Sequence, residues 1–137
     1  MNQLVKTFAM ALLISHLVFP AERASAHHSS AMFDPDKTVI LTGTVRKFDW
    51  INPHGFMDFV TVDDTGAVTK WVIECPSPTV MKYFGWSRDS IRAGDKVSVA
   101  FHPAKDGTNK GSILSVTLPD GKVLSSQDPK TRDQPKS

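Results

Sequence analysis

The sequence predicts an all-β domain with one short helix, folded as a five-stranded OB-fold-like Greek-key barrel. Three runs rich in β-branched residues come first, a short segment with helical spacing follows, and two further β-branched runs complete the pattern. Three strands, a helix and two strands is the element order of an OB-fold. Another small β-barrel, or a sandwich decorated by the helix, is the main alternative.

Turn residues separate the first three strands. The run TVILTGTVRKF alternates roughly in character, and Pro53 follows it, where a residue without an N–H cannot continue a ladder. The sequence DDTG, with Gly66 available for a positive φ, separates the second run from the third and predicts a hairpin. The three strands are expected at residues 38–48, 56–62 and 68–74.

The helical segment has recognisable ends. Ser77 is a good N-cap, Pro78 suits the first helical position, and Gly85 can end the helix. Three apolar side chains are expected to pack inward from it: Val80, Met81 and Phe84. The last two strands are expected at residues 96–103 and 112–118, followed by a short turn and extension.

The first 26 residues predict a signal peptide. Lys6 supplies a positive charge, an apolar run covers residues 7–19, and Ala24-Ser25-Ala26 fits the small-x-small cleavage pattern. The apolar run is shorter than the about 20 residues that span a bilayer, although an uncleaved anchor is the alternative. We expect cleavage after Ala26 and a periplasmic or secreted protein without a membrane span. The domain should cover residues 27–124, and a disordered polar tail residues 125–137.

Charge, cysteine content and missing motifs narrow the function classes. The formal net charge is +2 and no basic run is interleaved with aromatics, so nucleic acid is not expected as a partner. The single cysteine, Cys75, cannot form an intramolecular disulfide and lies in an apolar run, where a small buried hydrophobe is expected. The sequence has no phosphate-binding loop, nucleophile elbow, HExxH or CxxC motif, so an enzyme is the least supported class.

Most carboxylates fall in predicted turns, where turn chemistry explains them without catalysis. They are Asp34, Asp36, Asp63, Asp64, Asp95, Asp106 and Asp120. Asp58 and Glu74 instead lie within strands, where either can be a polar group on an exposed face.

Histidines are placed unevenly along the mature chain. His27 and His28 follow the expected cleavage site, His54 lies between the first two strands, and His102 lies at the end of the fourth. In an OB-fold the loops after the first and fourth strands flank the ligand-binding face, so we expect His54 and His102 at one rim. The alternative is that each histidine is a polar junction or turn residue that binds no metal.

Cleavage after Ala26 would add a further nitrogen donor. His27 would then carry an α-amine, with a pKa of about 7.7–8.0, beside its imidazole, and a metal can displace that proton near neutral pH. Such a nitrogen set suits Cu(II), while zinc fits three histidines with one open position. Met32, or less readily Cys75, could add soft character for Cu(I). The predicted site for copper or another transition metal comprises His27, His28, His54 and His102.

The loop after the first strand offers a second kind of site. Trp50 lies beside it and is expected to be an exposed stacking platform for a sugar, base or other planar ligand, with Asn52 in the same loop. The second hypothesis is therefore a module that binds an organic ligand or a protein partner without metal. It predicts metal-independent changes of tryptophan fluorescence when ligand is added.

Four motifs occur in order along the mature chain: AHHSSAMFD, LTGTVRKFDWINPH, GWSRDSIRAGD and HPAKDG. On these motifs, residues 27–124 resemble an uncharacterised family of exported bacterial proteins, a domain of unknown function. The resemblance implies that all four histidines of the mature chain fall within shared motif blocks. It brings no established activity with it.

Overall fold

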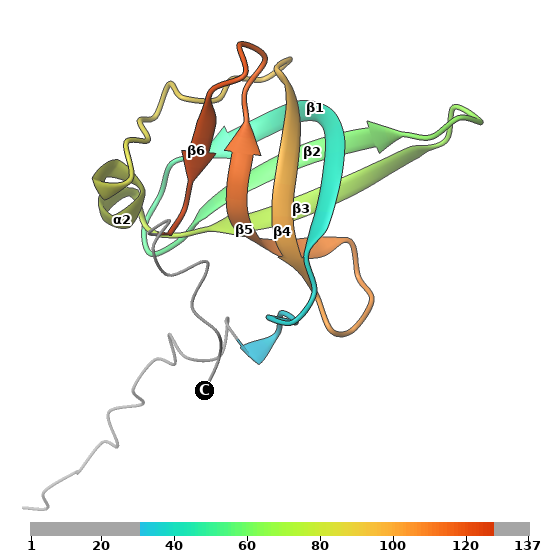
Figure 1. Cartoon of the computed structure of the whole chain (residues 1–137), viewed down its shortest axis with the longest axis horizontal. Coiled ribbons are helices and arrows are strands. Elements are labelled where there is room, and N and C mark those ends of the chain that lie inside the picture. Colours follow the sequence, from blue (N-terminus) through green and yellow to red (C-terminus); the bar gives the residue numbers. More distant parts are fainter. Residues whose placement is uncertain (1–30, 128–137) are drawn as a thin grey trace, which may run out of the picture.

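The computed structural model describes residues 31–127, in which five strands close into a barrel, a sixth strand pairs with one of them, and a short helix lies beside the barrel (Figure 1). The strands are β1 Val39–Asp49, β2 Gly55–Val62, β3 Val68–Cys75, β4 Lys96–Pro103, β5 Lys110–Thr117 and β6 Val123–Ser125, and the helix is α2, Pro78–Tyr83. The expected all-β, OB-fold-like barrel is therefore confirmed, with β6 as an additional strand. No helix within residues 31–127 has the length and apolar character needed to cross a membrane.

Closure of the barrel depends on one parallel pairing. The strands neighbour one another in the order β3-β2-β1-β4-β5-β6, and these pairs are all antiparallel. β3 also pairs in parallel with β5, through Val72 with Lys110 and Glu74 with Ser112. The segment containing α2 connects β3 to β4 and so makes the crossover that this closure requires.

β1 bends strongly so that it pairs with β2 along one part and β4 along another (Figure 1). A bulge lies between Val45 and Lys47, and bulges increase strand bending and twist. Gly43 lies just before the bend, where a Cβ would collide with the carbonyl oxygen of Val60. Glycine at this position therefore allows the two backbones to approach.

The core lies inside the barrel and follows the two-residue alternation of the strands. Its fully buried side chains are Phe59, Phe101, Met57, Ile73, Met81, Val45, Val97, Val99, Val116 and Cys75. Burial of Cys75 confirms that it is a small core residue. Trp86 is also buried, and its indole N–H donates to the Ser125 carbonyl at 2.6 Å.

The barrel continues past the expected boundary at residue 124. Ser125 ends β6, and Ser126 is buried with its hydroxyl donating to the Ile113 carbonyl at 2.7 Å. Composition predicts a polar tail from Ser125 onward, but strand pairing of Ser125 and the hydrogen bond of Ser126 hold these two residues against β5. The predicted signal peptide, residues 1–26, and residues 128–137 of the predicted tail lie outside the described residues.

The short helix begins as predicted, since the Ser77 hydroxyl accepts from the Val80 N–H at 3.4 Å. Met81 is fully buried and Phe84 packs partly against the core. Val80, however, is 43% exposed, so the expectation that it packs inward is wrong. Successive helical residues are rotated by about 100°, and with Met81 pointing directly inward Val80 turns toward solvent.

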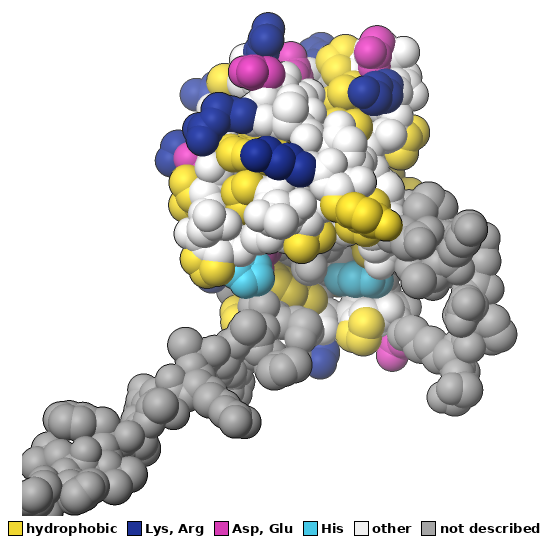
Figure 2. Space-filling view, turned by 90° about the vertical axis from the view of Figure 1, so that its left-hand side faces the viewer, with side chains coloured by type: hydrophobic (Ala, Val, Ile, Leu, Met, Phe, Trp, Pro, Cys, Tyr) yellow, Lys and Arg dark blue, Asp and Glu magenta, His cyan; other side chains and the backbone are white. Residues whose placement is uncertain are grey.

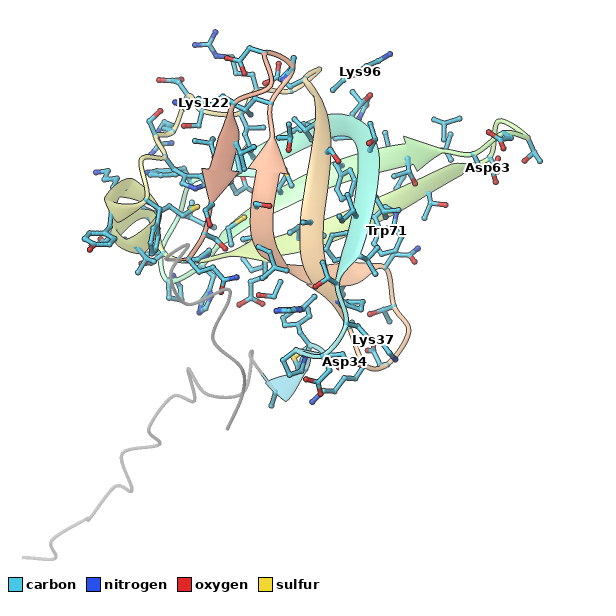
Figure 3. The ribbon with its side chains drawn as sticks, viewed as in Figure 1. Asp34, Lys37, Asp63, Trp71, Lys96 and Lys122 are labelled. Atoms are coloured by element: carbon cyan, nitrogen blue, oxygen red, sulfur yellow. The ribbon has the colours of Figure 1, made fainter. Side chains whose placement is uncertain are left out.

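The β2–β3 hairpin projects beyond the barrel, with Asp63 at its tip (Figures 1 and 3). The Asp63 carboxylate accepts from the Thr65 hydroxyl at 2.6 Å and from the Ala67 N–H at 2.9 Å. These hydrogen bonds hold the pKa of Asp63 below its usual value. Four further turn carboxylates accept backbone N–H bonds within their own turns: Asp34, Asp95, Asp106 and Asp120. The predicted structural role of these carboxylates is thereby confirmed.

Candidate functional site

His54 lies immediately before β2, at the end of the loop that connects it to β1. Its Nδ1 is 2.7 Å from a carboxylate oxygen of Glu74 on β3, and both side chains are partly buried. A carboxylate accepts hydrogen bonds, so Nδ1 carries the proton in this contact. The ring is therefore fixed against the neighbouring strand rather than within its own turn.

His102 lies near the end of β4, where the N-terminal segment joins the barrel. Its Nδ1 is 2.7 Å from the Lys37 carbonyl oxygen, which can only accept, so Nδ1 is the donor here too. The Asp34 N–H donates to the Pro103 carbonyl at 2.9 Å, and Phe33 forms an isolated bridge with Ala104. Figure 3 places Asp34 and Lys37 together at this end of the barrel.

The two rings share one chemical feature. In a neutral imidazole with Nδ1 protonated, Nε2 carries a lone pair that can bind a metal. Histidines that bind metals usually donate the other ring N–H to a carboxylate or a backbone carbonyl. His54 and His102 make these two kinds of hydrogen bond, although the same bonds also hold the loops in place without metal.

His54 and His102 share a rim but are separated along it. Glu74, the partner of His54, pairs with Ser112 on β5, and Ser112 pairs with His102 on β4. Two strand spacings therefore separate Glu74 from His102, about 10 Å. Figure 2 shows the histidine side chains as two distinct patches at one level of the surface. Within residues 31–127, no three His, Cys, Asp or Glu side chains are grouped to hold a metal ion.

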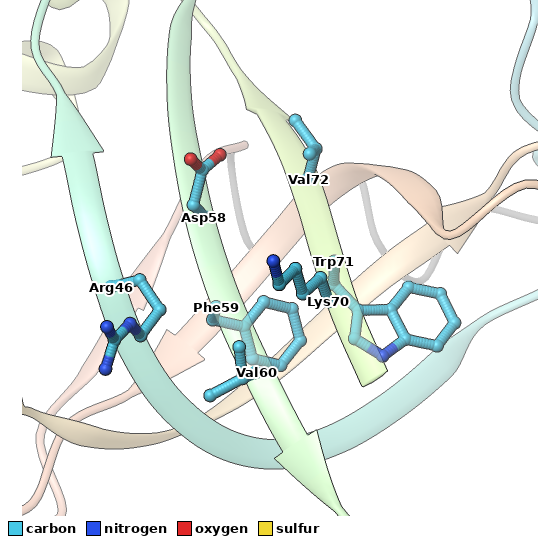
Figure 4. A pocket seen from close by; sticks show the side chains of 7 residues that line it. All are labelled: Arg46, Asp58, Phe59, Val60, Lys70, Trp71 and Val72. Carbon is cyan, nitrogen blue, oxygen red and sulfur yellow. The ribbon is translucent and has the colours of Figure 1, made fainter. Parts of the chain in front are cut away.

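A pocket of about 280 Å³ lies on the hairpin strands, a site that sequence reasoning missed (Figure 4). It is lined by Arg46, Asp58, Phe59, Val60, Lys70, Trp71 and Val72. Asp58 pairs with Val72, and Val60 pairs with Lys70, so these four side chains form adjacent outward positions on β2 and β3. The alternation of FMDFV and TKWV indicates which side chains of each strand face outward. It does not show which outward side chains of the two strands lie next to each other, and so does not reveal the pocket.

A model described as "Family of unknown function (DUF6152)" matches residues 15–113. The chain belongs to this family. None of the curated proteins compared with the chain matches it. The DUF6152 match includes His54, His102 and every residue of the hairpin pocket, and it ends within β5. The family therefore covers both candidate sites without supplying a function for either.

Other predicted site residues fare differently in this DUF6152 protein. His27 and His28 lie outside the described residues. Asn52 is exposed in the loop after β1. Trp50 is only 8% exposed and belongs to the core, so the expectation of an exposed stacking platform is wrong. It follows Phe48 by two residues, and an extended backbone turns both rings to one side, where they meet edge to face at 5.8 Å.

Burial raises the pKa of the Cys75 thiol to about 12, with a smaller contribution from the Glu74 carboxylate. A thiol that stays protonated is neither a nucleophile nor a ready metal ligand. Cys75 therefore has no place in a site of this native barrel, and the suggestion that it could bind Cu(I) finds no support in its surroundings.

The Cys75 environment predicts a pH-dependent stability. In the unfolded chain the thiol ionises near its ordinary pKa of 9.0, whereas in the folded chain it stays protonated to about 12. The unfolded state therefore binds fewer protons in this window, and stability should fall as pH rises through it. Urea unfolding of the wild type and of Cys75→Ala at pH 8 and pH 10.5 measures the effect. The difference between the two proteins should shrink at the higher pH, and an unchanged difference would contradict the buried neutral thiol.

Proposed function

We propose that this DUF6152 protein is an exported binding protein for a transition-metal ion, with copper preferred. The observation that carries the proposal is the hydrogen bond from His102 Nδ1 to the Lys37 carbonyl. This hydrogen bond leaves the lone pair of Nε2 available to bind a metal, at the point where the N-terminal segment meets the barrel. In this proposal the N-terminal histidines complete the nitrogen set.

Chain length supports a site shared by His102 and the N-terminal histidines. Lys105 donates its N–H to the Met32 carbonyl at 3.0 Å, which ties the chain to the barrel near His102. His28 precedes Met32 by four residues, and four residues span at most about 14 Å. In this proposal, that short connection lets His27 and His28 reach His102.

The donor types favour copper in this proposal. With cleavage after Ala26, the His27 α-amine, two N-terminal imidazoles and His102 Nε2 would supply four nitrogens, which suit the tetragonal preference of Cu(II). Met32 is 49% exposed at the same edge and offers a thioether for Cu(I). His54 contacts Glu74 on β3, away from His102 and the N-terminal segment. We therefore assign His54 the smallest contribution to metal affinity among the four proposed histidines.

Copper titration of the mature protein tests the site. The protein is purified from periplasm, its N-terminus at His27 is checked by intact mass, and Cu(II) binding is measured by calorimetry. We expect His102→Asn to weaken binding at least tenfold, because even the partners of metal ligands typically contribute ten- to a hundredfold. The asparagine amide can still donate to the Lys37 carbonyl, so the hydrogen bond is kept while Nε2 is lost.

His54→Asn is the matched control for this titration, with an expected change in affinity of less than threefold. Acetylation of the N-terminal amine should weaken binding as His102→Asn does. Unchanged Cu(II) affinity in His102→Asn would contradict the proposal that His102, on the rim of the barrel, is a copper ligand. If the intact mass shows that residues 1–26 are still present, His27 has no free α-amine, and both the chelating amine and the cleavage on export would be contradicted.

A further inference from the structure

We infer that the hairpin pocket on the outer face of β2 and β3 is a second, metal-independent site that binds a small organic acid with an apolar body. This inference is independent of the proposed metal site, because no histidine lines the pocket. It also differs from the planar-ligand site expected at Trp50, which is buried.

The charge of the pocket favours an anion. Arg46 and Lys70 both line it, and neither forms an ion pair within residues 31–127. Asp58 is the one carboxylate of the lining, which leaves a net charge of +1. The neighbouring cation Lys47 already pairs with Asp49 at 2.7 Å. Two cations without partners beside an apolar surface are therefore open to a carboxylate, sulfonate or phosphate group.

The apolar part of the pocket gives the ligand its second property. Val60 and Val72 project from β2 and β3 next to the charged side chains, and Val72 is 38% exposed. The two valines occupy diagonal positions of paired strands, about 7–8 Å apart, so one ligand ring can contact both. Burying a ligand ring or alkyl chain against them contributes roughly 25 cal/mol for each Å² removed from water.

Pocket size limits the ligand to a small molecule. The volume of about 280 Å³ lies just below the range of about 300–1,000 Å³ typical of sites for drug-sized ligands. One or two fused rings with a single acid group match this volume and the net charge. A polymer would need a longer groove than the seven lining residues provide.

Nitrogen-15 NMR titration of the full mature protein in EDTA tests the inference. The probes are 2-naphthoate, 2-naphthyl phosphate and the uncharged 2-naphthamide, which share one ring system. We expect saturable amide shifts at Asp58, Val60, Lys70 and Val72 with both acids, and at least tenfold weaker binding of the amide. The ratio of the two acid affinities identifies which acid group the site prefers.

Charge variants supply the matched controls. Arg46→Gln and Lys70→Gln should each weaken binding of the acids about fivefold or more, whereas Asp58→Asn should strengthen it, because it removes a repulsive charge. Lys122→Gln removes the same charge from the β5–β6 turn, far from the hairpin in Figure 3, and should change nothing. Equal binding of the amide, or acid affinities unaffected by Arg46→Gln and Lys70→Gln, would overturn the inference. Copper is absent throughout, so neither result bears on the metal proposal.

Discussion

Replacing Phe101 with alanine is expected to lower the free energy of unfolding by about 3–5 kcal/mol. Phe101 lies fully buried on β4, and its ring centroid is 5.4 Å from that of Trp71 on β3. The ring thus fills space between strands on opposite sides of the barrel. Its loss leaves a cavity, because strands held in a closed barrel cannot move inward to fill it. A domain of this size is typically stable by about 5–15 kcal/mol, so the change would remove a large share.

Urea unfolding followed by circular dichroism measures the effect of Phe101→Ala. Ile40→Ala is the matched control, because Ile40 is 67% exposed on β1, beside β4, and its loss should change stability by less than about 0.5 kcal/mol. A loss below about 1.5 kcal/mol for Phe101→Ala would mean that the barrel interior can repack around the missing ring.

Gly111→Ala is expected to destabilise the barrel by about 1–3 kcal/mol through overpacking. A Cβ at position 111 would lie 2.9 Å from Cγ and Cε2 of Phe101, and closer still to Cδ2. The sign is informative, because glycine to alanine within a strand would otherwise stabilise the protein by roughly 0.5–1 kcal/mol. Steric exclusion against a buried ring must therefore exceed the gain in backbone entropy.

A double-mutant cycle tests the mechanism of the Gly111 effect. Phe101→Ala removes all three ring atoms that a Cβ at position 111 would meet, so the double variant should be more stable than the sum of the single changes predicts. Ser112→Ala, at the next position of β5 and facing the opposite way, serves as control and should change stability little. Simple additivity, or no loss in Gly111→Ala, would contradict the steric account.

Local signals in the sequence determined the elements of this fold. Alternation and turn residues predicted the five barrel strands to within two residues, and Ser77 with Pro78 predicted the start of α2. The apolar run around Cys75 predicted its burial. These predictions succeed because strand period, capping and turn chemistry act between residues that are close along the chain.

The candidate sites were only partly predictable for the same reason. The sequence indicated that His54 and His102 flank loops, but not that Glu74 and the Lys37 carbonyl hold their rings. Trp50 looked like a loop residue, and only the packing of the barrel shows that it fills the core. The hairpin pocket depends on the register of β2 with β3, which brings Lys70 beside Val60.

Local sequence patterns are therefore enough to predict an OB-fold-like element order, the hairpin and the N-cap of α2 in this DUF6152 protein. Which of these residues come into contact depends on how the barrel closes. Because β3 pairs in parallel with β5, Glu74, the partner of His54, lies two strand spacings from His102. The bend of β1 brings Arg46 to the hairpin pocket. Such contacts join residues far apart along the chain, and their geometry follows from barrel closure, which no local pattern encodes.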